Sequence, residues 1–218
     1  MMMGDRQKMR GYADKDGDED FDKEEFGKSK ETWNFTFDFK FDTFKSKVDE
    51  YIDEASQYDE ETPEKDGGVS TVVISKKYPP HSWEEMKPFL EWMYPRVNEI
   101  WDTWDCKPME KYLSDSWVNK HPKNAHTCPH HHQNVTVAVA CYLNAPPNSG
   151  NLLIKTPLEV HKYSEPLLHD YYDMERDWKT IEVNTNDVLF FPGWLTHKTG
   201  VNKVDEDRYV VSLNIMGV

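Results

Sequence analysis

Seven short apolar segments separated by turn residues fill the second half of this 218-residue chain, and they constrain its fold more than any other feature. Each is long enough for one strand, and they lie at 110–118, 135–143, 151–155, 179–183, 187–191, 195–201 and 207–215. Short strands at such intervals predict a β-sandwich, a jelly roll or a barrel. The length of the chain suits one such domain.

The first half predicts helices and two further strands. Residues 33–42 alternate aromatic and polar side chains, the pattern of a strand with one buried face. Residues 44–55 place apolar side chains on one helical face, whereas 69–75 is typical of a strand. A capping box at 82–85 precedes a helical pattern over 86–104, whose two prolines predict a kink or a division into two helices. Helices followed by strands indicate an α+β class with N-terminal helices packed on one sheet.

Residues 1–30 are dense in charge and poor in aliphatic side chains, so we expect a mobile acidic segment ahead of a single domain over 31–218. The spacing of five acidic residues also follows a calcium-binding loop: Asp14, Asp16, Asp18, Asp22 and Glu25. Glu19 stands where that loop requires a turn glycine, and no second loop follows. A solvated tail is therefore our interpretation, and a calcium site is the alternative.

The charge balance disfavours two classes of partner. There are 26 basic and 40 acidic residues, giving a net charge of −14, which opposes binding to nucleic acid or to an anionic membrane. No apolar run approaches the roughly 18 residues of a membrane span, and the N-terminus shows no hydrophobic signal. The three cysteines include no CxxC pair, so neither a disulfide framework nor a thiolate zinc site is expected. We expect a cytoplasmic protein; the sequence leaves its oligomeric state open.

A histidine cluster marks a candidate metal site. Five of the nine histidines lie within 121–132, and the run HHH leads into the strand at 135–143. On an extended segment His130 and His132 face the same side, and His131 faces away. His197 follows the strand at 187–191 and is the best candidate for a third ligand. Two histidines and one distant residue, with coordination positions left open, suit a non-haem Fe(II) centre, although imidazole also suits zinc and an incidental cluster is the alternative.

Residues 117–218 resemble the 2-oxoglutarate/Fe(II)-dependent oxygenase superfamily, and most closely its small members from marine phages and bacteria. The resemblance rests on an ordered set of motifs: HHH at 130–132, YLN at 142–144, GNL at 150–152, DVLFFP at 187–192, His197, and RYVVSLN at 208–214. It implies a double-stranded β-helix, a distorted jelly roll that holds Fe(II) at its open mouth.

The resemblance also implies individual roles. The iron ligands would be His130, His132 and His197. Arg208 would pair with the distal carboxylate of 2-oxoglutarate, which suits its planar and permanently charged guanidinium. Tyr142 would contact the same carboxylate, and Asn119 and Ser212 would lie near the cosubstrate.

Two departures from the common family pattern stand out. Many members use His-x-Asp or His-x-Glu, whereas the second ligand here would be His132, so the site would lack a carboxylate charge. The common Arg-x-Ser pattern has Val210 in place of serine.

These features predict an Fe(II)- and 2-oxoglutarate-dependent oxygenase, expected to be a hydroxylase that uses O2 on a small-molecule or peptidyl substrate. One alternative is a cupin-like three-histidine metal protein without 2-oxoglutarate, although Thr136 and Val137 stand where a cupin glutamate is expected. The other is a non-catalytic binding or structural protein on the same fold. The inserted segment 157–178 is interpreted as a surface loop or as a cover of the pocket mouth.

Overall fold

A computed structural model describes residues 32–58, 65–156 and 178–218. The predictions for the acidic segment 1–30 and its calcium-loop pattern lie outside the described residues. So does the inserted segment up to residue 177. Within the described ranges, neither helix has the length and apolar character needed to cross a membrane.

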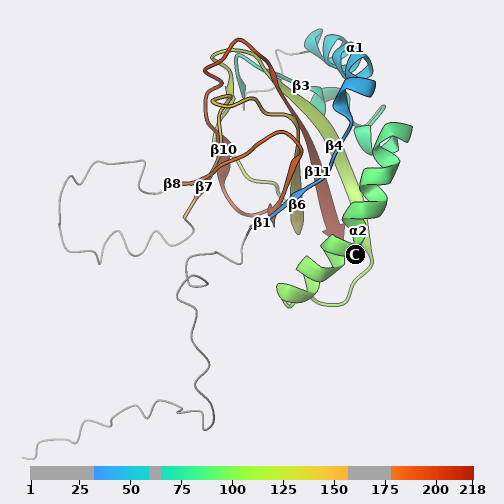
Figure 1. The fold of residues 1–218 in the computed structure, drawn as a ribbon. Helices are drawn as coiled ribbons and strands as arrows, with labels where there is room; N and C mark the ends of the chain where they lie inside the picture. The colour runs from blue at the N-terminus through green and yellow to red at the C-terminus, as the bar shows by residue number, and fades with distance from the viewer. Residues whose placement is uncertain (1–31, 59–64, 157–177) are drawn as a thin grey trace, which may run out of the picture. The chain divides into compact units, whose positions relative to one another are not determined.

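Six strands form the larger sheet in the order β1-β9-β6-β11-β4-β3, and every neighbouring pair is antiparallel. Its members are β1 (Trp33–Thr36), β3 (Val69–Ser70), β4 (Lys111–His121), β6 (Val137–Asn144), β9 (Asp187–Pro192) and β11 (Arg208–Gly217). The last strand of the chain thus lies between β4 and β6, in the middle of the sheet (Figure 1).

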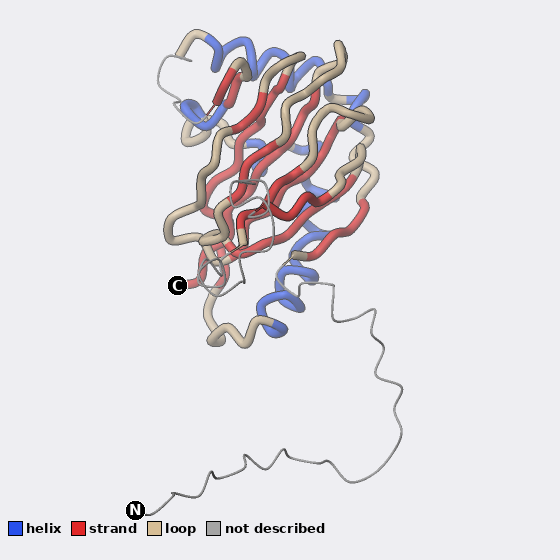
Figure 2. The backbone as a smooth tube through the Cα atoms, turned by 90° about the vertical axis from the view of Figure 1, so that its left-hand side faces the viewer, coloured by secondary structure: helices blue, strands red, loops and turns tan. Residues whose placement is uncertain are grey.

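A second sheet contains β10 (His197–Thr199), β7 (Leu152–Lys155) and β8 (Trp178–Ile181), in that order and all antiparallel. A short ladder also pairs β2 (Lys65–Asp66) with β5 (His126–Thr127). Figure 2 shows the strands, in red, running side by side. The seven strands predicted for the C-terminal half are all present, with bounds that differ by a few residues.

Two helices, α1 (Lys45–Ser56) and α2 (Lys87–Thr103), cover one face of the larger sheet (Figure 1). The alternation of β11 divides its side chains between two cores. Tyr209, Val211, Leu213 and Ile215 join the helices in the main core, whereas Val210 joins a second core that includes Leu152 and Ile154 of β7. The α+β class with helices packed on one sheet is therefore confirmed.

Two predicted strands are shorter than expected. The strand at 33–42 ends at Thr36, because the next backbone N–H groups turn to Asn186: Phe37 N–H donates to its carbonyl oxygen at 2.9 Å, and Phe39 N–H to its Oδ1 at 3.2 Å. The strand at 69–75 ends at Ser70. A 3₁₀ helix, η4 (Thr71–Ile74), follows because Ser70 Oγ accepts from Val72 N–H and caps it.

The capping box at 82–85 is wrong. Ser82 Oγ donates to the Pro79 carbonyl within η5 (Pro80–Ser82), and α2 begins only at Lys87. Between them lies η6 (Glu84–Met86). Of the two prolines, Pro88 lies in the first turn of α2, where its missing N–H has no helical acceptor. Pro95 lies inside α2 without dividing it, so of the two predicted outcomes, a kink or a division into two helices, the division is wrong.

Candidate metal centre

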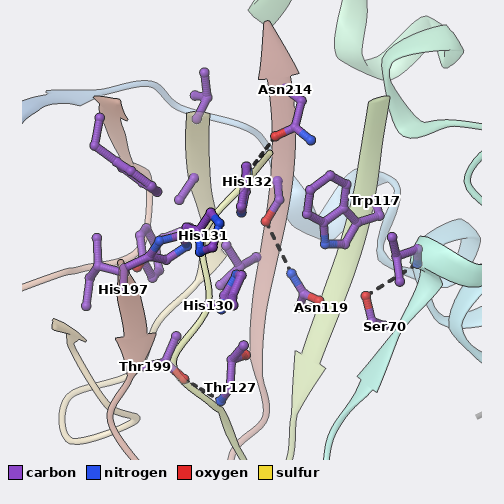
Figure 3. A pocket seen from close by; sticks show the side chains of 18 of the residues that line it. Ser70, Trp117, Asn119, Thr127, His130, His131, His132, His197, Thr199 and Asn214 are labelled. Atoms are coloured by element: carbon purple, nitrogen blue, oxygen red, sulfur yellow. Dashed lines mark hydrogen bonds between the residues drawn. The ribbon is translucent and has the colours of Figure 1, made fainter. Parts of the chain in front are cut away.

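Three predicted histidines converge at one point of the fold. His130 and His132 lie on the segment that enters β6, and His197 opens β10. Reciprocal backbone hydrogen bonds of 2.9 Å join His130 to His197, so the two segments are held edge to edge. The ligand atoms of all three side chains lie within 4.8 Å of one another (Figure 3). His131 lies outside this group and is exposed, although it also lines the cavity next to it.

The same pattern of hydrogen bonds orients each of these imidazoles. His130 Nδ1 lies 2.9 Å from the Cys128 carbonyl oxygen, and His197 Nδ1 lies 2.9 Å from the carbonyl oxygen of Leu195. His132 Nδ1 lies 2.6 Å from Asn214 Oδ1. Because carbonyl and amide oxygens only accept, each Nδ1 must carry the hydrogen. Each Nε2 therefore keeps its lone pair, as a metal ligand requires.

Burial also favours the neutral form of two of these side chains, His132 and His197. It is the main cause that lowers the pKa of His132 to about 4, while the hydrogen bond to Asn214 acts in the opposite direction. Burial, followed by the charge of a protonated His130, lowers the pKa of His197 well below its usual value. At neutral pH both imidazoles are unprotonated, so metal binding at these two positions displaces no proton.

The histidines line a cavity of about 220 Å³. Three of the residues predicted to contact the cosubstrate line it as well: Asn119 of β4, Tyr142 of β6 and Ser212 of β11. Asn119 Nδ2 donates to Ser212 Oγ at 3.2 Å across the β4–β11 pair. No Asp, Glu, Lys or Arg side chain of the described residues lines this cavity, so its wall, which mixes polar and apolar side chains, is uncharged apart from histidine.

Arg208 lies behind the cavity wall and is completely buried. Its Nη1 donates to the carbonyl oxygens of Ser149 and Gly150 at 2.6 and 2.7 Å, and to that of Gly200 at 3.3 Å. Its Nη2 donates to Thr199 Oγ1 at 2.9 Å, and Thr199 lines the cavity. Arg208 is therefore connected to the cavity through Thr199, and its guanidinium does not form part of the lining.

The donor set at Arg208 fits a carboxylate. Its Nε is buried with no hydrogen-bond partner, and no acidic side chain in the described part of the chain forms an ion pair with the guanidinium. Burial lowers the pKa of Arg208 and raises that of Tyr142, so the latter is a neutral phenol able to donate. A buried cation without a counter-charge is costly, and a bound anion would offset that cost.

The three histidines also fit a metal ion. Three imidazoles whose ligand atoms lie within 4.8 Å of one another, with no fourth His, Cys, Asp or Glu of the described residues in the group, suit Fe(II) and other divalent transition metals. The site thus combines a three-nitrogen face with a nearby buried cation, an arrangement that can hold a metal and an anionic chelator together.

Sequence reasoning missed two polar residues of the site. Asn214, the hydrogen-bond partner of His132, closes the motif RYVVSLN and shares a face of β11 with Arg208 and Ser212, so the two-residue period was an available signal. Thr199 connects Arg208 to the cavity and also accepts from Thr127 N–H at 2.8 Å. No pattern in the sequence distinguishes Thr199 from other turn residues.

Comparison with known proteins agrees with this geometry. Residues 115–214 match the family model described as "Putative 2OG-Fe(II) oxygenase". No curated protein sequence matches the chain.

Solved structures share the fold at low identity. The carbocyclase SnoK from nogalamycin biosynthesis, titled non-heme alpha ketoglutarate dependent, has a TM-score of 0.57 at 13% identity, over 86% of this chain and 79% of that one. A Pseudomonas putida prolyl-4-hydroxylase has a TM-score of 0.52 at 12% identity, over 86% and 92%.

Proposed function

Since the matched region of this chain belongs to the 2-oxoglutarate/Fe(II)-dependent oxygenases, we propose that the protein is an oxygenase that couples oxidative decarboxylation of 2-oxoglutarate to oxidation of a second substrate. Hydroxylation is the proposed reaction. The observation that carries the proposal is Arg208, a buried cation with an unpaired Nε beside the cavity that contains the three-histidine group.

Each side chain then has a defined task. His130, His132 and His197 would hold Fe(II) through their Nε2 atoms. Arg208 and Tyr142 would bind the distal carboxylate of 2-oxoglutarate, and the Asn119–Ser212 pair would contact its chain. Fe(II), when bound, would supply the redox chemistry that activates O2. The protein would position both substrates and exclude water.

We extend the proposal to the fold and the substrate. The two antiparallel sheets, with a core between them and the site at one opening, support a double-stranded β-helix. The uncharged cavity wall supports a substrate that presents a neutral group to the iron, from either a small molecule or a peptide. The similar structures include enzymes titled as prolyl hydroxylases and one titled as a carbocyclase, so they favour neither class. A cytoplasmic location remains a prediction.

A three-histidine metal protein that does not use 2-oxoglutarate is the second candidate. It is favoured by His132, which stands where many relatives have a carboxylate ligand. It leaves the buried, uncompensated charge of Arg208 without an explanation, and for that reason we prefer the oxygenase.

Titration of the Fe(II)- or Ni(II)-loaded protein with 2-oxoglutarate under anaerobic conditions tests the proposal, followed by measurement of succinate after O2 is admitted. We expect saturable binding and Fe(II)-dependent succinate formation. Metal binding without 2-oxoglutarate binding would favour the second candidate. Failure to bind any divalent metal would favour a non-catalytic protein.

A further inference from the structure

We infer that Asn214 is a positioning residue that sets the orientation and donor strength of His132, and hence the metal affinity of the site. This inference rests on the proposed metal centre. Asn214 does not belong to the three-histidine group. It acts through His132, whose Nδ1 donates to Asn214 Oδ1 at 2.6 Å, the shortest of the three histidine contacts (Figure 3).

The partner of His132 differs in kind from those of its neighbours. His130 and His197 donate to backbone carbonyls two residues earlier in their own segments, so local backbone geometry fixes them. His132 donates to a side chain on β11, 82 residues away in sequence. Among the three imidazoles it is therefore the one whose orientation depends on a replaceable side chain.

The strand geometry at Asn214 supports this role. The β4–β11 register shifts between Asn214 and Ile215: Asn214 faces Asp115, while Ile215 faces Leu113. The extra residue, Ser114, donates through Oγ to the Asn214 carbonyl at 3.3 Å. A bulge bends the strand pair and changes the direction of nearby side chains. This bulge lies at the residue whose amide must meet an imidazole from a different segment.

The choice of an amide has a chemical consequence. A neutral acceptor fixes the Nδ1–H tautomer and leaves Nε2 as a neutral donor, and none of the three imidazoles donates to a carboxylate among the described residues. A carboxylate at the same place would polarise the imidazole and make Nε2 a stronger donor. Asn214 would thus leave a bound metal less electron-rich than a carboxylate at this position would.

Two substitutions and a matched control separate the effect of Asn214 on the orientation of His132 from its effect on packing. Asn214→Leu keeps the approximate size of the side chain and removes the oxygen that accepts from His132. Asn214→Asp keeps an acceptor oxygen and adds a negative charge. Asn144→Leu is the control, because Asn144 on neighbouring β6 donates to Glu206 and to the Asp207 carbonyl, and it does not line the cavity. Each protein is titrated with Co(II), whose visible spectrum reports ligand geometry, and each metal-free protein is melted.

We expect Asn214→Leu to weaken Co(II) binding about 10–100-fold and to alter the visible spectrum. Asn214→Asp should bind at least as tightly as the parent, and Asn144→Leu should match the parent in affinity. Parent-like affinity in Asn214→Leu would overturn the inference, as would an equal loss in Asn214→Asp. If Asn214→Leu does not fold, two other results still test the inference: the metal affinity of Asn214→Asp, and the tautomer of His132 in the parent determined by ¹⁵N NMR. An Nε2–H tautomer contradicts the inference. A parent that binds no Co(II) would instead contradict the proposed function.

Discussion

Arg208 can approach Gly150 because Gly150 has no side chain. Arg208 Nη1 lies 2.7 Å from the Gly150 carbonyl oxygen, and a Cβ added to Gly150 would lie 2.2 Å from the Gly200 carbonyl oxygen and 2.5 Å from the same nitrogen. Gly150 also has a φ of +97°, which residues with a side chain rarely adopt. The guanidinium therefore joins the loop at 149–150 to Gly200 through carbonyl contacts that require this glycine.

Gly150→Ala should destabilise the protein and displace Arg208. Gly67→Ala is the control, because Gly67 also has a positive φ, of +72°, but its added Cβ would meet nothing closer than 3.6 Å. Both changes incur a backbone cost of roughly 1–2 kcal/mol, and Gly150→Ala adds about 1–3 kcal/mol of overpacking. Denaturant unfolding measures both. Equal losses would show that the close approach of Gly150 to Gly200 and Arg208 does not constrain the loop.

Replacing His132 by glutamine should weaken metal binding by more than the roughly 10–100-fold loss expected when a hydrogen-bond partner of a ligand, such as Asn214, is replaced. The loss is larger because the substitution removes a metal ligand itself. His131→Gln, at the exposed neighbour, should leave metal affinity unchanged. Calorimetric titration with Ni(II) compares the two variants. A similar loss in both would indicate that the HHH run binds metal as a flexible cluster and not through alternate side chains.

The metal-free protein should lose stability as the pH falls. The unfolded imidazole of His132 titrates near 6.5, whereas burial lowers the folded pKa to about 4. The unfolded state therefore binds more protons between these values. The stabilising contribution is complete above pH 6.5 and falls by up to about 1.4 kcal/mol per pH unit toward pH 4. Urea unfolding across this range measures the slope, and His132→Gln should reduce it. An unchanged slope in that variant would assign the acid sensitivity to other groups.

Two tyrosine-to-phenylalanine changes on opposite faces of the larger sheet should have different effects. Tyr142→Phe removes a phenol that lines the cavity, and we expect 2-oxoglutarate affinity to fall about tenfold or more, as for loss of a hydrogen bond to a charged group. Tyr209→Phe removes the 2.7 Å hydrogen bond to Asp49 on the helix side. It should lower stability by about 1 kcal/mol and leave 2-oxoglutarate affinity unchanged. A loss of affinity in Tyr209→Phe alone would reverse the assignment of the two faces.

Much of the fold and site was predictable because alternation and helical spacing are local properties. The period of two in the strands that became β6, β9 and β11 identifies which side chains share a face. The same period places His130 and His132 together with His131 outside. It was less reliable at 33–42, where Asn186 provides hydrogen bonds that end the strand at Thr36. At 82–85 the sequence has a helix-start signal, but in the structure Ser82 lies in a 3₁₀ helix, where its Oγ donates to the Pro79 carbonyl.

The sequence by itself determined the class of fold, the three histidines and the buried arginine as candidates, because each depends on residue type and short-range spacing. Only the tertiary structure decided how these candidates meet. The 2.9 Å backbone pairing of His130 with His197, the contact of Asn214 with His132 and the carbonyl cradle around Arg208 join residues 8 to 82 positions apart. Such contacts depend on which strands become neighbours and on a bulge in one register, and neither is encoded in a local pattern.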